Sequence, residues 1–301
     1  MKSWYMLPLK VIGVTVTLFI CYTLAAPILG PQPGPATPQE AAQAAMALLV
    51  VCLLDAIVMS YLIVRSRWSG WRLMAAVGLV FYGVTTFMSQ IESAVFLTKL
   101  PAGMVPRLFV MGLAIAAPFA VVAVVILGKA KAASSAGPIP RLVMPPAEWA
   151  WKLAIIAVVY ATLYFTFGYF IAWQSPDVRA YYGGTNNGSF VAQMASVVRD
   201  TPWLVPLQLL RGLLWAAIAL PVVRMMRGPW QETALSLGAL FAIVMNAQLL
   251  LPNPYMPETV RMAHMLETAS SNFVFGCFVG WLLTRRAARM PLAHSAVAEG
   301  A

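Results

Sequence analysis

The chain has 301 residues, of which 61% are hydrophobic and only 10% are charged, and its mean hydropathy is +0.78. Soluble domains carry about 25% charged residues, so this composition excludes a large water-soluble catalytic domain and indicates a multi-pass membrane protein. The net charge of +10 does not indicate nucleic-acid binding, because the basic residues form short clusters between apolar runs rather than one basic face. We interpret the clusters as charges that set membrane orientation.

Eight apolar segments follow one another along the chain, and a helix needs about 20 such residues to cross a bilayer. The end of the first segment also resembles a signal-peptide cleavage site at Thr23-Leu24-Ala25. Its apolar run is long for a signal peptide, which favours retention as a helix. The sequence therefore predicts an all-α bundle of about eight membrane-spanning helices near residues 7–29, 41–64, 71–97, 106–127, 149–173, 203–223, 230–251 and 260–283.

The connections between the segments differ in charge. If sides alternate, most Lys and Arg residues fall on the side of the N-terminus, and the other side holds only Lys99, Arg107, Arg179, Arg199 and Arg261. The positive-inside rule then predicts a bacterial-type inner-membrane protein with both termini in the cytoplasm. The cytoplasmic parts would include the linker 129–146 and the tail 285–301.

Two connections carry further information. The extracytoplasmic loop 174–202 begins with turn formers and continues with Phe190, Val191, Met194, Val197 and Val198. Their helical spacing predicts a short amphipathic helix that anchors at the interface or covers the bundle. The linker 129–146 divides the chain into two sets of four segments, but the polar positions of the two sets do not match, so the sequence alone does not favour an internal duplication.

Ionisable and polar residues inside the apolar segments are the candidate functional residues. A charged side chain at the centre of a membrane helix costs about 2.5 to 3.5 kcal/mol, so such residues need partners. His264, Glu267, Ser271 and Asn272 are spaced to form one polar stripe on a helix. At 1.5 Å rise per residue, the stripe begins about 6 Å from the outer face.

The same depth estimate groups other polar residues with this stripe. Arg211 lies about 12 Å from the outer face, Glu267 about 10 Å and Glu92 about 8 Å, whereas Asp55 lies about 18 Å in, near the midplane. The neutral polar residues Gln90, Gln208, Asn246 and Gln248 belong to the outer half as well.

We therefore expect Glu92, Arg211, His264 and Glu267 to converge on a polar site that opens to the extracytoplasmic side. Two carboxylates and one guanidinium leave one negative charge, which a protonated His264, a bound proton or a cation would cancel. The alternative is that Arg211 only neutralises the glutamates and pins the bundle. The full set of candidate substrate- or proton-binding residues is Glu92, Arg211, His264, Glu267, Asp55, Gln90, Gln208, Asn246 and Asn272.

These residues favour a protein that binds or translocates a small solute or proton, because ionisable groups within a bundle commonly mark ion paths. An intramembrane enzyme acting on a lipid-linked or phosphate-bearing substrate is the first alternative, although His-Glu-x-x-His and nucleophile-elbow motifs are lacking. A non-catalytic membrane subunit or assembly factor, in a homo- or hetero-oligomer, is the second.

Cofactors and metals are not expected from the sequence. His264 is the one histidine within an apolar segment, and Cys21, Cys52 and Cys277 lie in separate segments without the spacing of a zinc or redox motif. The expected partners are the lipid bilayer and a small ligand or proton.

Overall fold

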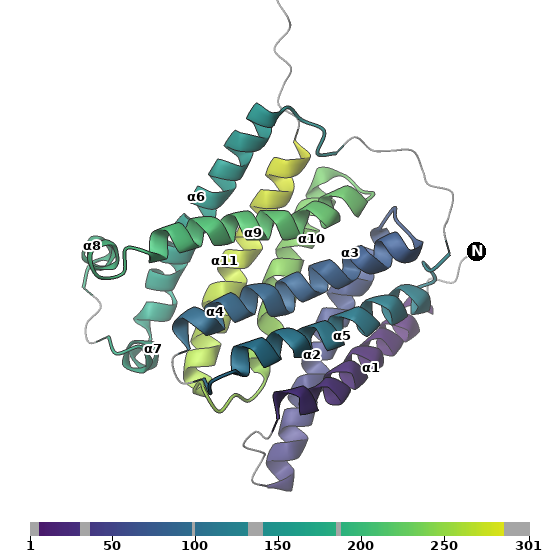
Figure 1. Cartoon of the computed structure of the whole chain (residues 1–301), viewed down its shortest axis with the longest axis horizontal. Helices are drawn as coiled ribbons and strands as arrows, with labels where there is room; N and C mark the ends of the chain where they lie inside the picture. Colours follow the sequence, from purple (N-terminus) through teal and green to yellow (C-terminus); the bar gives the residue numbers. More distant parts are fainter. Residues whose placement is uncertain (1–5, 31–36, 98–99, 132–140, 185–187, 286–301) are drawn as a thin grey trace, which may run out of the picture.

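The computed structural model describes residues 6–30, 37–97, 100–131, 141–184 and 188–285, which fold into one helical bundle (Figure 1). The linker residues 132–140, the loop residues 185–187 and the tail beyond 285 lie outside the described residues. The described residues contain no strand, only one isolated bridge between Ser66 and Met226. The prediction of an all-α fold is thus confirmed.

The first half of the chain supplies four long helical segments. They are α1 (Met6–Ala25) with a 3-10 turn (Ala26–Leu29), α2 (Pro38–Arg65), α3 (Gly70–Tyr82) continued by a π-helical stretch (Gly83–Phe87) and α4 (Met88–Phe96), and α5 (Met104–Ile126). Helix α2 begins where Thr37 caps it: its side chain accepts a hydrogen bond from the Glu40 amide at 3.2 Å.

The second half supplies four more segments and two short helices. The long segments are α6 (Pro146–Phe170) with a 3-10 turn (Ala172–Gln174), α9 (Leu204–Met225), α10 (Trp230–Ala239) continued by a π-helical stretch (Leu240–Val244) and a 3-10 turn (Ala247–Leu250), and α11 (Glu258–Thr284). The short helices, α7 (Pro176–Tyr181) and α8 (Phe190–Asp200), lie in the loop 174–202, and α8 occupies the amphipathic stretch.

Within the part of the chain that the structure describes, seven helical segments are long and apolar enough to cross a membrane: 6–29, 38–65, 70–96, 104–126, 146–174, 204–225 and 230–250. Helix α11 has 27 residues, so at 1.5 Å per residue it is also long enough to cross. It is less apolar than the others because its first turns carry the stripe of His264, Glu267, Ser271 and Asn272. The chain is a polytopic membrane protein.

The ends of the segments meet at two opposite ends of the bundle. At what we call the basic end, Arg67 N–H donates to the Met225 carbonyl at 2.7 Å, and Arg141 from the linker donates to the Met226 carbonyl at 2.9 Å. At what we call the loop end, Arg107 at the start of α5 donates to the Leu29 carbonyl after α1 at 3.1 Å. Consecutive long segments therefore run up and down.

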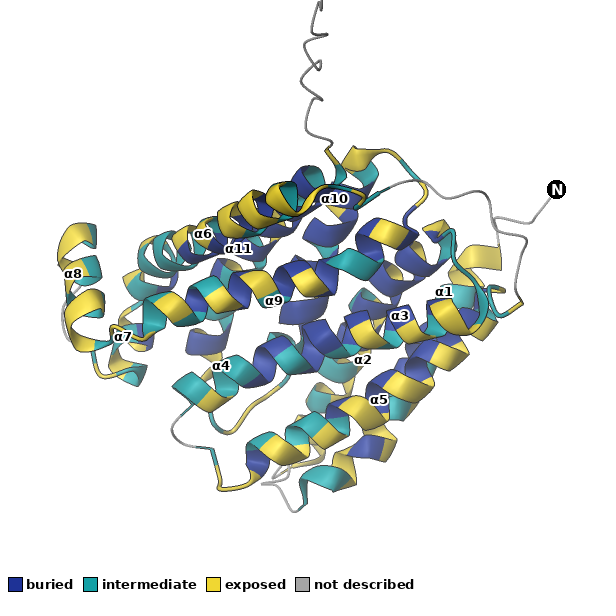
Figure 2. Ribbon diagram, turned by 45° about the horizontal axis from the view of Figure 1, so that its top comes forward, coloured by how far each residue is buried: buried dark blue, intermediate teal, exposed yellow. Residues whose placement is uncertain are grey.

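Close packing in the second half depends on small residues. A Cβ at Gly280 would lie 2.5 Å from the Ala234 Cα atom, and one at Gly276 would lie 2.5 Å from the Leu237 carbonyl oxygen. The Gly276-x-x-x-Gly280 spacing thus brings α11 against α10 inside the chain. Figure 2 shows α8 largely exposed at the side of the bundle, whereas α10 is mostly buried.

Candidate functional site

The centre of the candidate site is an ion pair between two segments far apart in sequence. Arg211 on α9 is 1% exposed and donates from Nη2 to Glu92 Oε1 on α4, whose side chain is 33% exposed. The Nη1 atom of Arg211 donates to Gln208 Oε1 at 3.0 Å. The rings of Tyr160 and Tyr164 lie against the guanidinium, with centroids 5.4 and 6.0 Å from its Cζ atom. Arg211 is therefore fixed by a carboxylate, an amide and two aromatic rings.

A second polar pair lies on α11. His264 Nδ1 is 2.9 Å from Glu267 Oε2, and His264 Nε2 is 3.2 Å from the hydroxyl of Tyr182, which follows α7 in the outer loop. Burial raises the pKa of Tyr182 further above its usual range, so its hydroxyl keeps its proton and can donate to a neutral His264. Nδ1–H then faces Glu267, and the three side chains form a chain of hydrogen bonds from the loop inward.

The two pairs border one small cavity of about 20 Å³, which is room for about one water molecule. Glu92 and Glu267 lie on its wall, as do Ser271 and Asn272 from the stripe on α11. The remaining lining comes from Tyr160, Leu163, Tyr164, Thr268 and Phe275. The structure thus brings Glu92 from α4 and the stripe on α11 to one cavity, and Arg211 and His264 bond to its two carboxylates.

Comparisons with protein-family models, with curated proteins and with solved structures found no match. The function is therefore argued from the geometry of this site.

The π-helical stretches place further polar groups beside the cavity. Asn246, two residues past the second stretch, donates to the Ala242 carbonyl at 2.8 Å and accepts a hydrogen bond from Thr268 on α11. Gln248 donates to Ser89 Oγ on α4 at 2.6 Å. A π-bulge shifts the hydrogen-bond register of a helix and frees carbonyls, and Asn246 satisfies one of those carbonyls here. Asn246 therefore supports the wall of the site rather than lining it.

Two candidate residues are not part of this arrangement. Asp55 on α2 is 1% exposed, and among the described residues its Oδ1 atom has no hydrogen-bond partner. Gln90 is 8% exposed, and its Oε1 atom likewise lacks a partner within the described part of the chain. Neither residue lines the cavity. Asp55 was expected near the midplane, deeper than the other candidates, and Gln90 in the outer half beside Glu92, so depth alone did not decide which residues line the cavity.

Sequence reasoning missed the tyrosines. Tyr160 and Tyr164 are four residues apart on α6, which places them on one face, and both face Arg211. Tyr182 contacts His264 from the loop. The available signal was the i, i+4 spacing of two amphipathic rings in an apolar helix, because buried tyrosine hydroxyls usually need partners.

The site can exchange a proton and hold a small polar group. With His264 neutral, Glu92, Arg211 and Glu267 sum to one negative charge, and one added proton makes the cluster neutral. No group of three or more His, Cys, Asp or Glu side chains that could hold a metal ion occurs among the described residues.

Proposed function

We propose that the protein binds and translocates a proton, or a small solute together with a proton, through the polar site at the loop end. The observation that carries the proposal is the hydrogen-bonded series Tyr182, His264 and Glu267, which leads from the loop to the cavity wall. Because a net charge is costly away from water, a buried cluster with one excess negative charge favours uptake of one proton.

The proposed setting is a bacterial-type inner membrane with the basic end in the cytoplasm. At that end gather Arg65, Arg67, Lys129, Arg141 and Arg285; Arg65 bonds to the Glu232 carboxylate, and Arg67, Lys129 and Arg141 bond to backbone carbonyls at helix ends. Cationic loops are retained on the cytoplasmic side, so this gathering supports cytoplasmic termini. The polar site would then face the extracytoplasmic side.

The test is proton flux into vesicles that contain the purified full chain, with a pH gradient imposed across the membrane. Glu267→Gln should abolish most of the flux, because the amide removes the excess negative charge and the carboxylate that would take up the proton. Glu258→Gln is the matched control: it makes the same chemical change on the exposed first turn of the same helix. Equal flux in wild type, Glu267→Gln and empty vesicles would reject the proposal.

A lipid-linked substrate is a second candidate, supported by a groove on the other side of α6 and α9. This apolar groove has a volume of about 290 Å³ and is covered by α8 through Met194, Val197 and Val198. Its floor comes from the same two helices that present Tyr160, Tyr164 and Arg211 to the cavity. Turnover of a lipid-linked phosphate in vesicles that show no flux would favour an enzyme that acts on such a substrate. Co-purification of a stoichiometric partner would instead favour a membrane subunit.

A further inference from the structure

The two halves of the chain, 6–128 and 146–284, pack their helices in the same pattern. In the first half α1 packs against α2 and α5, and α3 packs against α5; in the second half α6 packs against α9 and α11, and α10 packs against α11. Between the halves, α3 contacts α9, and α2 contacts α10 and its π-helical continuation. Exchanging α1, α2, α3 and α5 with α6, α9, α10 and α11 therefore reproduces the contacts. Figure 1 shows the first half, in purple to blue, beside the second half, in teal to yellow.

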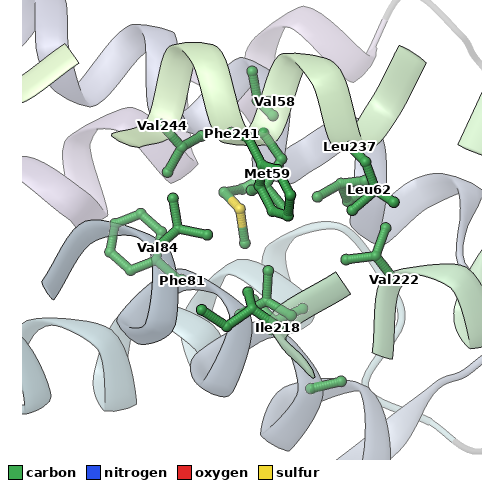
Figure 3. Packing of buried hydrophobic residues seen from close by; sticks show 14 of the residues in the cluster. Val58, Met59, Leu62, Phe81, Val84, Ile218, Val222, Leu237, Phe241 and Val244 are labelled. Carbon is green, nitrogen blue, oxygen red and sulfur yellow. The ribbon is translucent and has the colours of Figure 1, made fainter. Parts of the chain in front are cut away.

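Residues in the core between the halves correspond at one constant spacing. Val58 and Ile218 are 160 positions apart (218 − 58), and Phe81 and Phe241 have the same spacing (241 − 81). Figure 3 shows these residues in one buried cluster, together with two further pairs at this spacing, Leu62 with Val222 and Val84 with Val244. A constant spacing without gaps across two helices and their connection is what an internal repeat predicts.

Two glycines extend the correspondence to the last helix of each half. Gly78 faces Ala120 of α5, and Gly238, again 160 positions later (238 − 78), faces Cys277 of α11. Ala120 and Cys277 are 157 positions apart (277 − 120), so the fourth helices keep nearly the same spacing.

The basic end shows the relation between the halves directly. Arg67 N–H donates to the Met225 carbonyl, and Arg227 N–H donates to the Arg65 carbonyl, at 2.7 and 3.3 Å. Residues 67 and 227 are 160 positions apart, and so are residues 65 and 225. A two-fold rotation therefore exchanges these two bonds. A lysine on the first helix of each half lies at the end of that half's last helix: Lys152 donates to the Arg285 carbonyl after α11, and Lys10 Nζ lies 3.6 Å from where a Cβ of Gly128 after α5 would stand.

We propose that the chain consists of two four-helix repeats, related by a two-fold axis along the membrane normal, that rock against each other between two ion-pair clasps. The loop-end clasp is Glu92 with Arg211. The basic-end clasp is Arg65, which donates to both oxygens of Glu232 at 2.5 and 2.7 Å, with Tyr61 donating to Oε1 at 3.1 Å. Both clasps join one repeat to the other.

The surface between the clasps suits a rocking motion. It is built from apolar side chains such as Met59, Ile218 and Phe241 (Figure 3), and apolar contacts are not directional. Tilting one repeat can therefore open one end while the other end stays closed. Because Glu92 lines the small cavity, opening the loop-end clasp would expose it. This motion explains how the closed site would open. It rests on the proposed function for the identity of the solute path.

The test is reciprocal labelling of reporter cysteines in the full chain, after Cys21, Cys52 and Cys277 are replaced by alanine. Leu62→Cys reports on the basic-end side of the core and Met88→Cys on the loop-end side, since both positions are fully buried. A membrane-impermeant maleimide is added from each side of sealed vesicles. Glu232→Gln should raise labelling at position 62 severalfold and lower it at position 88, and Glu92→Gln should do the reverse.

Arg65→Gln removes the other residue of the basic-end clasp and should reproduce the labelling of Glu232→Gln. Agreement between the two variants separates rocking from a folding defect in one of them. Labelling that changes only beside the altered clasp, or at neither reporter, would overturn the proposal. The labelling needs no transport: reciprocal labelling without proton flux would leave the motion standing and reject the proposed function, and flux without reciprocal labelling would do the opposite.

Discussion

The first and second repeats share a packing pattern, yet they contribute unequally to the polar site: the first supplies Glu92, and the second supplies Arg211, His264 and Glu267. At the spacing of 160, Arg211 corresponds to Val51 and Gln208 to Leu48. Val51 is fully buried, as is nearly all of Arg211. The same buried position therefore accommodates an apolar or a charged residue, provided that the charge has partners. This difference indicates that packing defines the fold of both repeats, and that a few charged residues, most of them in the second repeat, make the site.

The largest effect is expected when the second repeat is made like the first at its charged position. Arg211→Val leaves Glu92 and Glu267 without a cation and should destabilise the protein by about 3 to 5 kcal/mol, as removal of one partner of a buried pair does. The measurement is the thermal unfolding midpoint in mild detergent. Glu92→Gln/Arg211→Val should recover part of the loss, and an Arg211→Val protein as stable as wild type would show that the pair is only incidental.

The corresponding glycines test whether the two repeats are packed equally tightly. A Cβ at Gly238 would lie 2.6 Å from Cys277 Sγ and 3.1 Å from the Phe273 carbonyl oxygen, whereas one at Gly78 would lie 3.4 Å from Ala120 Cβ. Gly238→Ala should therefore cost about 1 to 3 kcal/mol, the usual range for overpacking. Gly78→Ala should cost little in the same unfolding assay. Equal losses would contradict the tighter packing at Gly238 than at Gly78.

Hydropathy predicted the helical segments well, because crossing a bilayer demands a long apolar run. The observed bounds of each long segment lie within about three residues of the predicted ones. The π-helical stretches at Gly83–Phe87 and Leu240–Val244 were not predicted, since a one-residue change in hydrogen-bond register depends on packing and leaves no composition signal.

The candidate site was predictable in depth but not in azimuth. Counting residues along each helix placed Glu92 and Arg211 in one layer, and the structure brings them into contact. The same counting could not tell that Gln90, which was expected in the same outer half, does not line the cavity. The repeat escaped notice because the comparison used polar positions, whereas the halves correspond in apolar ones such as Phe81 and Phe241.

Asp55 is a buried acid in the first repeat. Its replacement tests whether the carboxyl group only lowers the stability of the protein. The side chain is 1% exposed, and its Oδ1 atom lacks a partner among the described residues. Asp55→Leu should raise stability by about 1 to 3 kcal/mol, because the unpaired polar group is removed from an apolar site. The contrary result is an Asp55→Leu protein that is less stable than wild type while Glu267→Gln still abolishes the flux. That result would mean that Asp55 meets a partner in another arrangement of the two repeats.

The smallest effect is expected at the basic-end clasp, which joins the repeats with the same chemical groups as the loop-end pair but in contact with water. The Arg65 side chain is 44% exposed and that of Glu232 is 13% exposed, against 1% for Arg211. Exposed ion pairs contribute about 1 kcal/mol or less and are screened by salt. Glu232→Gln should therefore lower the unfolding midpoint slightly at low salt and hardly at all in high salt, whereas the loss in Arg211→Val should persist at both salt concentrations. A loss of stability in Glu232→Gln that is as large as that in Arg211→Val and insensitive to salt would contradict this. The basic-end clasp would then be as shielded from water as the loop-end clasp, and the two ends would open with equal difficulty.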